Sequence, residues 1–324
     1  YNDVDWYELE KTVKSAVHFL DNVVDANKYA TPEIEQMTKA TRKIGLGVMG
    51  FADLLIQLKV QYNSIEGRKL GKDIMSFIRE KADLQSKKIA NERGVFPAWD
   101  KSDYGEDEKY RNACRLTVAP TGTISMLADT SSGIEPTFAL AWKKSNILEG
   151  QTLYYVNKYF EADAKKHGFY SEDLMEHLSQ GGSLQTREDV PPWAKEIYIT
   201  APEISAEDHV EMQSAFQEDC DSGISKTINF PNEATIADVE AAYILHEEVM
   251  ESLIPSPLGN VNGLKFDPVS YKGDFKWTNI PDITRNPDGI IGFFRGIMAS
   301  ASKPIKTDFG YVILFKRTST TPAA

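Results

Sequence analysis

The amino-acid sequence predicts an α/β protein that is rich in helix. Residues 4–27 and 64–93 carry apolar side chains at the spacing of an amphipathic helix. Residues 116–118 and 225–230 are short apolar or alternating runs typical of strands, and each is followed by a proline that stops the ladder. With 324 residues, the chain can bury a large core as one domain or two.

Capping residues and periodicity delimit the other expected elements. Thr31 with Pro32 is typical of a helix start, and Gly94 is typical of a helix end. Further helices are expected at 51–58, 153–167, 171–178, 205–218 and from Thr235 to about 253, with a loop at 96–108, a short strand at 196–200, strand-like pieces at 309–315 and a disordered polar end at 318–324.

Composition excludes several partners. The net charge is −12 and the pI is about 5, which argues against nucleic acid or an anionic membrane surface as a partner. No window reaches the roughly 18 apolar residues of a membrane span, and the first residues form no signal peptide. Cys114 and Cys220 cannot form a disulfide framework, so we expect buried thiols and a cytoplasmic location. Since the first residue is not Met, we expect the chain to be part of a longer one.

A turn rich in hydroxyls and glycine follows the strand at 116–118. It consists of Pro120, Thr121, Gly122, Thr123, Ile124 and Ser125. The first N–H groups of a helix have no partner within it, and the helix dipole favours negative charge there. Small residues let phosphate oxygens approach the backbone, and the hydroxyls can donate further hydrogen bonds. The turn is therefore a candidate phosphate-binding site.

A simpler interpretation of the same turn stays open. Thr121 or Thr123 would then only cap the following helix, which is a common use of Ser and Thr. The turn also lacks the Gly-Lys-Ser/Thr ending of a Walker loop. Spacing alone supports a candidate phosphate site and no more.

Gly45, Gly47 and Gly50 satisfy the Gly-x-Gly-x-x-Gly pattern of dinucleotide-binding folds. However, the preceding residues 39–43 are mostly polar and basic rather than strand-like. No acidic residue stands at the end of a second strand about 20 residues on, where such a fold places a ribose partner. We therefore interpret these glycines as sites of close backbone packing.

The histidines predict no metal site. His167, His177 and His209 lie on polar, helical segments, and no spacing pairs them as ligands. His18 lies near the apolar face of its helix, where we expect it to be half-buried with one hydrogen bond.

Three blocks of sequence carry a resemblance to a known family. They are Arg42-Lys-Ile-Gly-Leu-Gly-Val-Met-Gly-Phe-Ala-Asp-Leu-Leu55, then Ala119-Pro-Thr-Gly-Thr-Ile-Ser125 with Thr130-Ser-Ser-Gly-Ile-Glu-Pro136, and Ser225-Lys-Thr-Ile-Asn-Phe-Pro231. In this order, across roughly residues 4–245, the chain resembles the catalytic subunit of ribonucleotide reductase, in particular the adenosylcobalamin-dependent class II enzymes.

The resemblance implies a fold and a site. The fold is a ten-stranded α/β barrel of two five-stranded halves, of which residues 1–245 supply the C-terminal half. The turn from Pro120 to Ser125 is implied to hold the phosphates of the substrate. Lys226 and Asn229 become weaker site candidates near the end of a barrel strand.

The resemblance also implies a reaction, a cofactor and partners. Enzymes of this family replace the 2′-hydroxyl of a ribonucleotide with hydrogen. Adenosylcobalamin generates a thiyl radical that abstracts the 3′-hydrogen, and a cysteine pair supplies the reducing electrons. The implied partners are a ribonucleoside di- or triphosphate, a thioredoxin-type reductant for the full enzyme, the upstream half of the catalytic subunit and a second copy in a homodimer.

The chain departs from the family in two places. The radical cysteine of the family stands in an Asn-x-Cys-x-Glu context upstream of the residues matched here, and neither Cys114 nor Cys220 has that context. We therefore assign no catalytic residue and expect the chain alone to be inactive. From about His246 the family pattern ends, and seven of the 15 prolines follow Leu253. Residues 246–324 are expected to form a divergent segment of unknown role.

Two other functions stay open on the sequence. The chain could be a non-catalytic module that binds nucleotides or phosphate, or a structural half-barrel that needs an upstream chain. An upstream reading frame with the radical cysteine would favour the enzyme.

Overall fold

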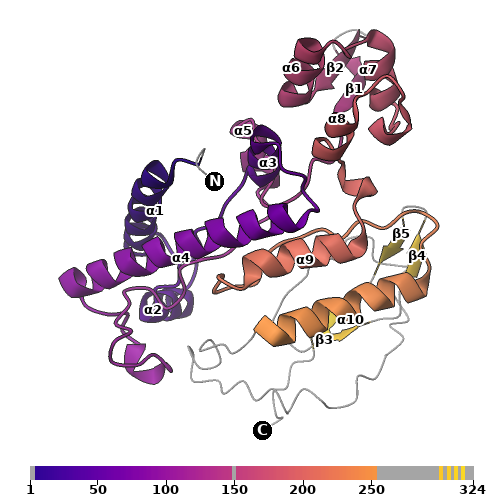
Figure 1. Cartoon of the computed structure of the whole chain (residues 1–324). Coiled ribbons are helices and arrows are strands. Elements are labelled where there is room, and N and C mark those ends of the chain that lie inside the picture. The colour runs from indigo at the N-terminus through magenta and orange to yellow at the C-terminus, as the bar shows by residue number, and fades with distance from the viewer. Residues whose placement is uncertain are drawn as a thin grey trace.

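A computed structural model shows the arrangement of the helices (Figure 1). It describes residues 4–147, 151–253 and four short strands between residues 299 and 317. Helix α4 (Ile65–Arg93) runs through the middle of the described chain. Helix α1 (Trp6–Ala26) packs on one side of α4 and α9 (Ala206–Gln217) on another, while α10 (Ile236–Leu253) packs on α9.

The two long helices form where the periodicity places them. Helix α1 buries Val13, Val17 and Val24 on one face, and the Asp5 side chain accepts the amide of Glu8 at its start. Helix α4 begins after Ser64, which caps the amide of Gly67. Both sequence-based predictions are confirmed.

Three extended segments lie side by side and parallel at the centre of the fold. Leu46 pairs with Leu116, and Val118 pairs with Ile224, each through a parallel bridge. Residues 116–118 are therefore the middle segment. Leu116 and Val118 are buried as predicted, but they form two single bridges rather than the predicted strand. Because parallel segments end at the same edge, this pairing brings the three motif blocks together.

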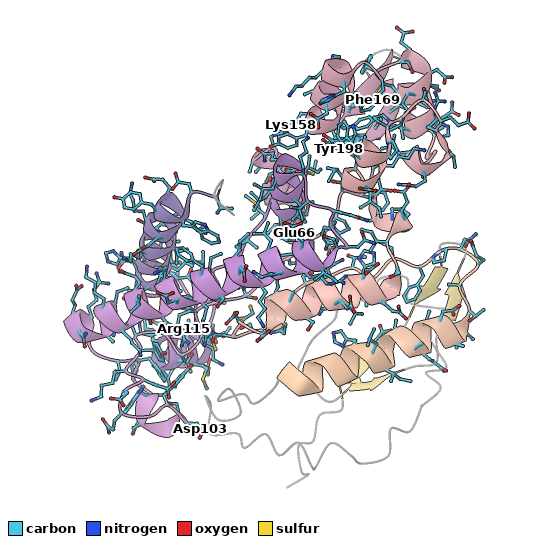
Figure 2. The ribbon with its side chains drawn as sticks, in the orientation of Figure 1. Glu66, Asp103, Arg115, Lys158, Phe169 and Tyr198 are labelled. Carbon is cyan, nitrogen blue, oxygen red and sulfur yellow. The ribbon has the colours of Figure 1, made fainter. Side chains whose placement is uncertain are left out.

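Arg115 ties the middle segment to its surroundings. Its fully buried side chain donates from Nε to Asp83 of α4, and the amides of Arg115 and Leu116 donate to Asp221. Figure 2 shows Arg115 beside α4. The bond from the buried guanidinium to Asp83 and the two amide bonds to Asp221 together fix the position of this segment along the helix.

The glycines of the first block serve close packing, as predicted. A Cβ placed on Gly47 would lie 2.2 Å from the carbonyl oxygen of Thr117, which is backbone and cannot move aside. Helix α3 (Phe51–Leu58) follows directly. The first segment is therefore packed closely against the middle segment at Gly47.

A second lobe, at the upper right of Figure 1, holds its own core around Phe160 and Tyr198. Figure 2 labels Phe169 and Tyr198 within it. Its elements follow one another as β1 (Ala141–Ile147), β2 (Gln151–Val156), α6 (Lys158–His167), α7 (Glu172–Ser179), η2 (Leu184–Thr186), α8 (Pro192–Ile197) and η3 (Ala201–Glu203).

Two predictions in this lobe are wrong. Residues 153–156 belong to strand β2, which pairs antiparallel with β1, rather than to a helix. The Asn157 side chain accepts the amides of Tyr159 and Phe160, so the helix starts only there. Residues 196–200 form no strand, because α8 occupies 192–197 and buried Tyr198 anchors the chain that follows it.

The remaining elements are short or lie near the ends of the described chain. They are α2 (Pro32–Thr41), η1 (Trp99–Lys101), α5 (Gly122–Leu127), β3 (Ala299–Ala301), β4 (Ile305–Thr307), β5 (Gly310–Val312) and β6 (Phe315–Arg317). Strands β5 and β6 cover part of the strand-like pieces predicted at 309–315. The polar end predicted to be disordered, at 318–324, lies outside the described residues. Among the described helices, none is both long and apolar enough to span a membrane.

Candidate functional site

Thr121 stands at the start of α5 but does not cap it. Its φ is 53°, a left-handed conformation that is unusual for a β-branched residue. The side chain makes no capping hydrogen bond, and its Oγ1 instead accepts the amide of Gly133 at 2.7 Å. The first turn of α5 therefore has no side-chain cap, contrary to the simpler interpretation of the turn.

The predicted phosphate turn is open to solvent on one side. Pro120, Gly122, Thr123 and Ile124 are exposed, and Thr121 is half-buried. Since the amides of Gly122 to Ile124 lie in the first turn, they have no acceptor within the helix. The Thr121 hydroxyl can still donate a hydrogen bond while it accepts one. We call the residues from Pro120 to Ser125 the cradle.

Ser125 has a different position from the other cradle hydroxyls. It is 1% exposed, and its Oγ lies 2.8 Å from Ser132 Oγ and 3.4 Å from the carbonyl oxygen of Gly122. The side chain of Ser125 therefore supports the cradle from within. The Thr121 hydroxyl contacts Gly133 of the following loop, and Thr123 is the exposed hydroxyl residue of the cradle.

A support loop, residues 130–135, lies directly behind the cradle. Asp53 of α3 holds the start of this loop, because its Oδ2 accepts the Thr130 hydroxyl at 3.0 Å and the Ser131 amide at 2.8 Å. The amide of Gly50 also donates to the carbonyl oxygen of Ser131 at 2.8 Å. The first and second sequence blocks thus contact each other directly.

The end of the support loop is held by the third block. Lys226 Nζ donates to Glu135 Oε2 at 2.7 Å, and the amide of Thr227 donates to Glu135 Oε1 at 2.7 Å. Lys226, a candidate from the sequence, therefore does not point into solvent; its side chain is 0% exposed. Asn229 is half-buried, and its role stays a prediction.

His209 completes this buried cluster. It receives a hydrogen bond from Lys226 Nζ at its Nδ1, 2.8 Å away, while its Nε2 faces the carbonyl oxygen of Ala201 at 3.3 Å. Burial, and secondly the charge of Lys226, lowers the pKa of His209 to about 4. Burial likewise lowers the pKa of Lys226, against the influence of Glu135. His209 is thus fully buried rather than on polar ground as the sequence suggested.

The sequence indicates no role for Asp53 or Glu135, which the structure shows holding the two ends of the support loop. Both stand inside the recognised blocks, but a single carboxylate in a helix or turn gives no signal until its partner is known. The separations are 78 residues for Asp53 with Ser131 and 91 for Glu135 with Lys226.

Both cysteines are buried thiols, as predicted. Burial raises the pKa of the Cys114 thiol to about 11, so the thiolate is scarce at neutral pH. His18 was expected to be half-buried; it is exposed and lies 3.0 Å from Arg93 Nη2 through its Nε2. Within the described residues, no group of three or more His, Cys, Asp or Glu could hold a metal ion.

Comparison with known proteins identifies the family to which this fold belongs. The family model described as the ribonucleotide reductase barrel domain matches residues 1–110 and 106–246. The chain therefore belongs to the ribonucleotide reductase family and supplies part of its α/β barrel domain. This confirms the resemblance carried by the three sequence blocks.

Individual relatives agree with the family. The chain is 46% identical over 247 residues to a vitamin B12-dependent ribonucleoside-diphosphate reductase of Thermoplasma acidophilum, covering 76% of this chain and 32% of that protein. It is 41% identical over 241 residues to the enzyme of the same name in Mycobacterium tuberculosis, covering 74% and 34%. The chain thus spans about a third of the length of these relatives.

A solved structure shows the same fold. The class Id ribonucleotide reductase alpha subunit of Actinobacillus ureae matches with a TM-score of 0.64 at 24% sequence identity, covering 76% of this chain and 45% of that chain.

Proposed function

We propose that this chain is part of an adenosylcobalamin-dependent ribonucleotide reductase and supplies the cradle that binds the substrate phosphates. The observation that carries the proposal is the first turn of α5, which no side chain caps and whose residues Gly122, Thr123 and Ile124 are exposed. Uncapped amides and a helix dipole favour an anion at this place. The substrate of the complete enzyme is a ribonucleoside di- or triphosphate.

The cradle contributes by positioning rather than by bond chemistry. Amides and hydroxyls that are already oriented lower the entropic cost of fixing the phosphates, and with them the ribose. Neither Cys114 nor Cys220 stands in the Asn-x-Cys-x-Glu context of the radical cysteine, so we propose that the radical and reducing cysteines belong to another part of the catalytic subunit. A thioredoxin-type reductant would renew that cysteine pair in the full enzyme.

The surface around the cradle supports completion by the upstream half of the subunit. Ile124 is 54% exposed, Met126 77% and Leu127 84%, although all three are large apolar residues of one short helix. Such apolar groups at one surface are typical of an interface. We propose that the upstream half covers them, in a cytoplasmic enzyme that forms a homodimer.

Adenosylcobalamin is proposed as the cofactor of the complete enzyme, where it would start the radical chemistry. Two surface hollows in the described part of the chain, of about 440 and 320 Å³, are lined by side chains of α1 and of α3 with α6. Neither lining includes a cradle residue, so neither hollow adjoins the proposed substrate site. We therefore assign no cofactor contact to the described residues.

Calorimetric titration of the chain with CDP, ADP and pyrophosphate tests the cradle. We expect binding that Thr121→Ala/Thr123→Ala weakens by about tenfold or more, which corresponds to about 1.4 kcal/mol. The matched control is Thr12→Ala/Thr186→Ala, which removes two hydroxyls from exposed positions outside the cradle. Equal affinity in the two double variants would contradict the proposal.

Adding the upstream half of the catalytic subunit tests the reaction. We expect reduction of CDP or CTP with adenosylcobalamin and a dithiol only when both halves are present. Binding without any reduction in the assembled protein would favour a phosphate-binding module instead.

A further inference from the structure

Lys226 is a buried cation whose hydrogen bonds are all directed inward. Its Nζ donates to Glu135 Oε2 at 2.7 Å, to the carbonyl oxygen of Thr227 at 2.6 Å and to His209 Nδ1 at 2.8 Å. An ammonium group has three donors, so all of them are used. Since the side chain is 0% exposed, Lys226 cannot contact a phosphate on the cradle without leaving these partners.

Glu135 links this cation to the support loop. One of its oxygens accepts Lys226 Nζ and the other accepts the amide of Thr227. The neighbouring carbonyl oxygen of Ile134 accepts the hydroxyl of buried Tyr62 at 2.6 Å. The end of the support loop is thus fixed by three hydrogen bonds that come from outside it.

The support loop transmits this position to the cradle. Gly133, two residues before Glu135, donates its amide to Thr121 Oγ1, and Ser132 Oγ lies 2.8 Å from Ser125 Oγ. Thr121 has a left-handed backbone, which a β-branched residue keeps only when its surroundings hold it. The Lys226–Glu135 pair is therefore connected to Thr121 through the backbone of residues 133–135 and one hydrogen bond.

We propose that Lys226 and Glu135 form a positioning pair that sets the phosphate affinity of the cradle without touching the phosphate. The inference rests on the proposed function of the cradle and adds to it the residues that hold its backbone in place. A buried ion pair is a weak source of stability compared with apolar packing, but it selects one arrangement of the groups that it joins. Removal of Glu135 leaves the buried Lys226 charge without its partner, whereas the Glu135 carboxylate is 23% exposed and loses its cation.

A double-mutant cycle on the full 324-residue chain tests the pair. Lys226→Met and Glu135→Gln keep the approximate side-chain volume, and each is expected to weaken CDP and pyrophosphate binding by about tenfold. The double variant Glu135→Gln/Lys226→Met leaves no uncompensated charge and is expected to weaken binding less than the product of the two single effects.

Arg42→Met is the matched control for lost stability. Arg42 forms a buried ion pair with Asp21 between α1 and the end of α2, with side chains 4% and 0% exposed. Its loss should lower the melting temperature without changing diphosphate affinity. Hydrogen exchange supplies a second readout, because the Ser131 and Gly133 amides should exchange faster in the Lys226 and Glu135 variants but not in Arg42→Met.

The outcomes separate this inference from the function on which it rests. If the wild-type chain binds diphosphates, Thr121→Ala/Thr123→Ala loses binding and the folded pair variants bind as the wild type does, only the positioning pair is overturned. If the wild-type chain binds no diphosphate, both the proposed phosphate cradle and the proposed positioning pair are overturned. The inference is supported if the Lys226 and Glu135 variants bind diphosphate more weakly and exchange the Gly133 amide faster, while Arg42→Met does neither.

Discussion

The Gly133 amide donates to Thr121 Oγ1 across 2.7 Å, and both residues have a positive φ, 45° for Gly133 and 53° for Thr121. Two unusual backbone conformations therefore support each other through one hydrogen bond. Thr121 uses for this contact the oxygen that would otherwise cap α5, and the helix start is left uncapped. The conformation of the cradle is thus set by a residue 12 positions further along the chain.

Gly133→Ala should disturb this contact. A Cβ at Gly133 would lie 3.3 Å from the carbonyl oxygen of Ala119 on a left-handed backbone, so we expect a loss of about 1–3 kcal/mol in the free energy of unfolding. Urea unfolding measures this loss, and calorimetry should show weaker diphosphate binding. Gly181→Ala is the control, because it has a φ of 86° and open space around the added Cβ. It should lose stability without losing affinity.

Asp53→Ala should release the start of the support loop. The substitution removes the acceptor of the Thr130 hydroxyl and of the Ser131 amide, and hydrogen bonds to a charged group contribute about 1.5–3 kcal/mol each. We expect the free energy of unfolding to fall by about 2–4 kcal/mol in urea. Asp73→Ala, which removes an exposed pair with Lys69 on α4, should change it by less than about 0.5 kcal/mol. Equal effects of the two substitutions would contradict the anchoring role of Asp53.

Stability should decrease below pH 6.5 through His209. Its pKa is lowered from 6.5 to about 4 in the folded protein, so between these values the unfolded chain binds a proton that the folded chain does not. The free energy of unfolding therefore falls as the pH drops from 6.5 to 4, by up to about 3 kcal/mol from this residue, and no further below that. Urea unfolding at pH 7, 5.5 and 4.5 should give a shallower decrease for His209→Gln. An unchanged slope would refute this assignment.

The cysteines should resist thiol reagents in the folded protein. Cys114 is 4% exposed with a pKa near 11, and Cys220 is buried too. At pH 8 we expect Ellman's reagent to react with less than a tenth of the thiols in native protein and with both after unfolding in guanidinium chloride. Rapid reaction of one thiol in the native state would show that its region opens easily.

The sequence predicted the long helices and the buried segment at residues 116–118, because the signals for both are local. Periodic apolar residues and a Ser64 cap determine α4, and apolar Leu116 and Val118 mark a buried segment. The wrong predictions also have local causes. Residues 153–156 continue the helical spacing of α6 although they pair with β1, and only that partner strand decides between the two structures.

Much of the site could not be derived from the sequence. The turn at Pro120 to Ser125 was predicted, but its left-handed Thr121 depends on Gly133. Lys226 was expected near a strand end, and its inward direction follows only from the positions of Glu135 and His209. Long-range pairs of charged residues have no spacing rule, so a single sequence does not reveal them.

The anchors of the support loop limit how this chain can be recombined with its relatives. Asp53 and Lys226 both contact the support loop, one from before it in the sequence and the other from after it. The cradle lies between these two residues in the chain. A chimera with a crossover inside residues 53–226 takes one anchor from each parent, and its cradle then depends on the match between foreign contacts. Crossovers before Gly45 or after Pro231 keep the whole set from one parent. A segment exchanged between relatives should therefore be longer than any of the three sequence blocks and should include residues 45–231.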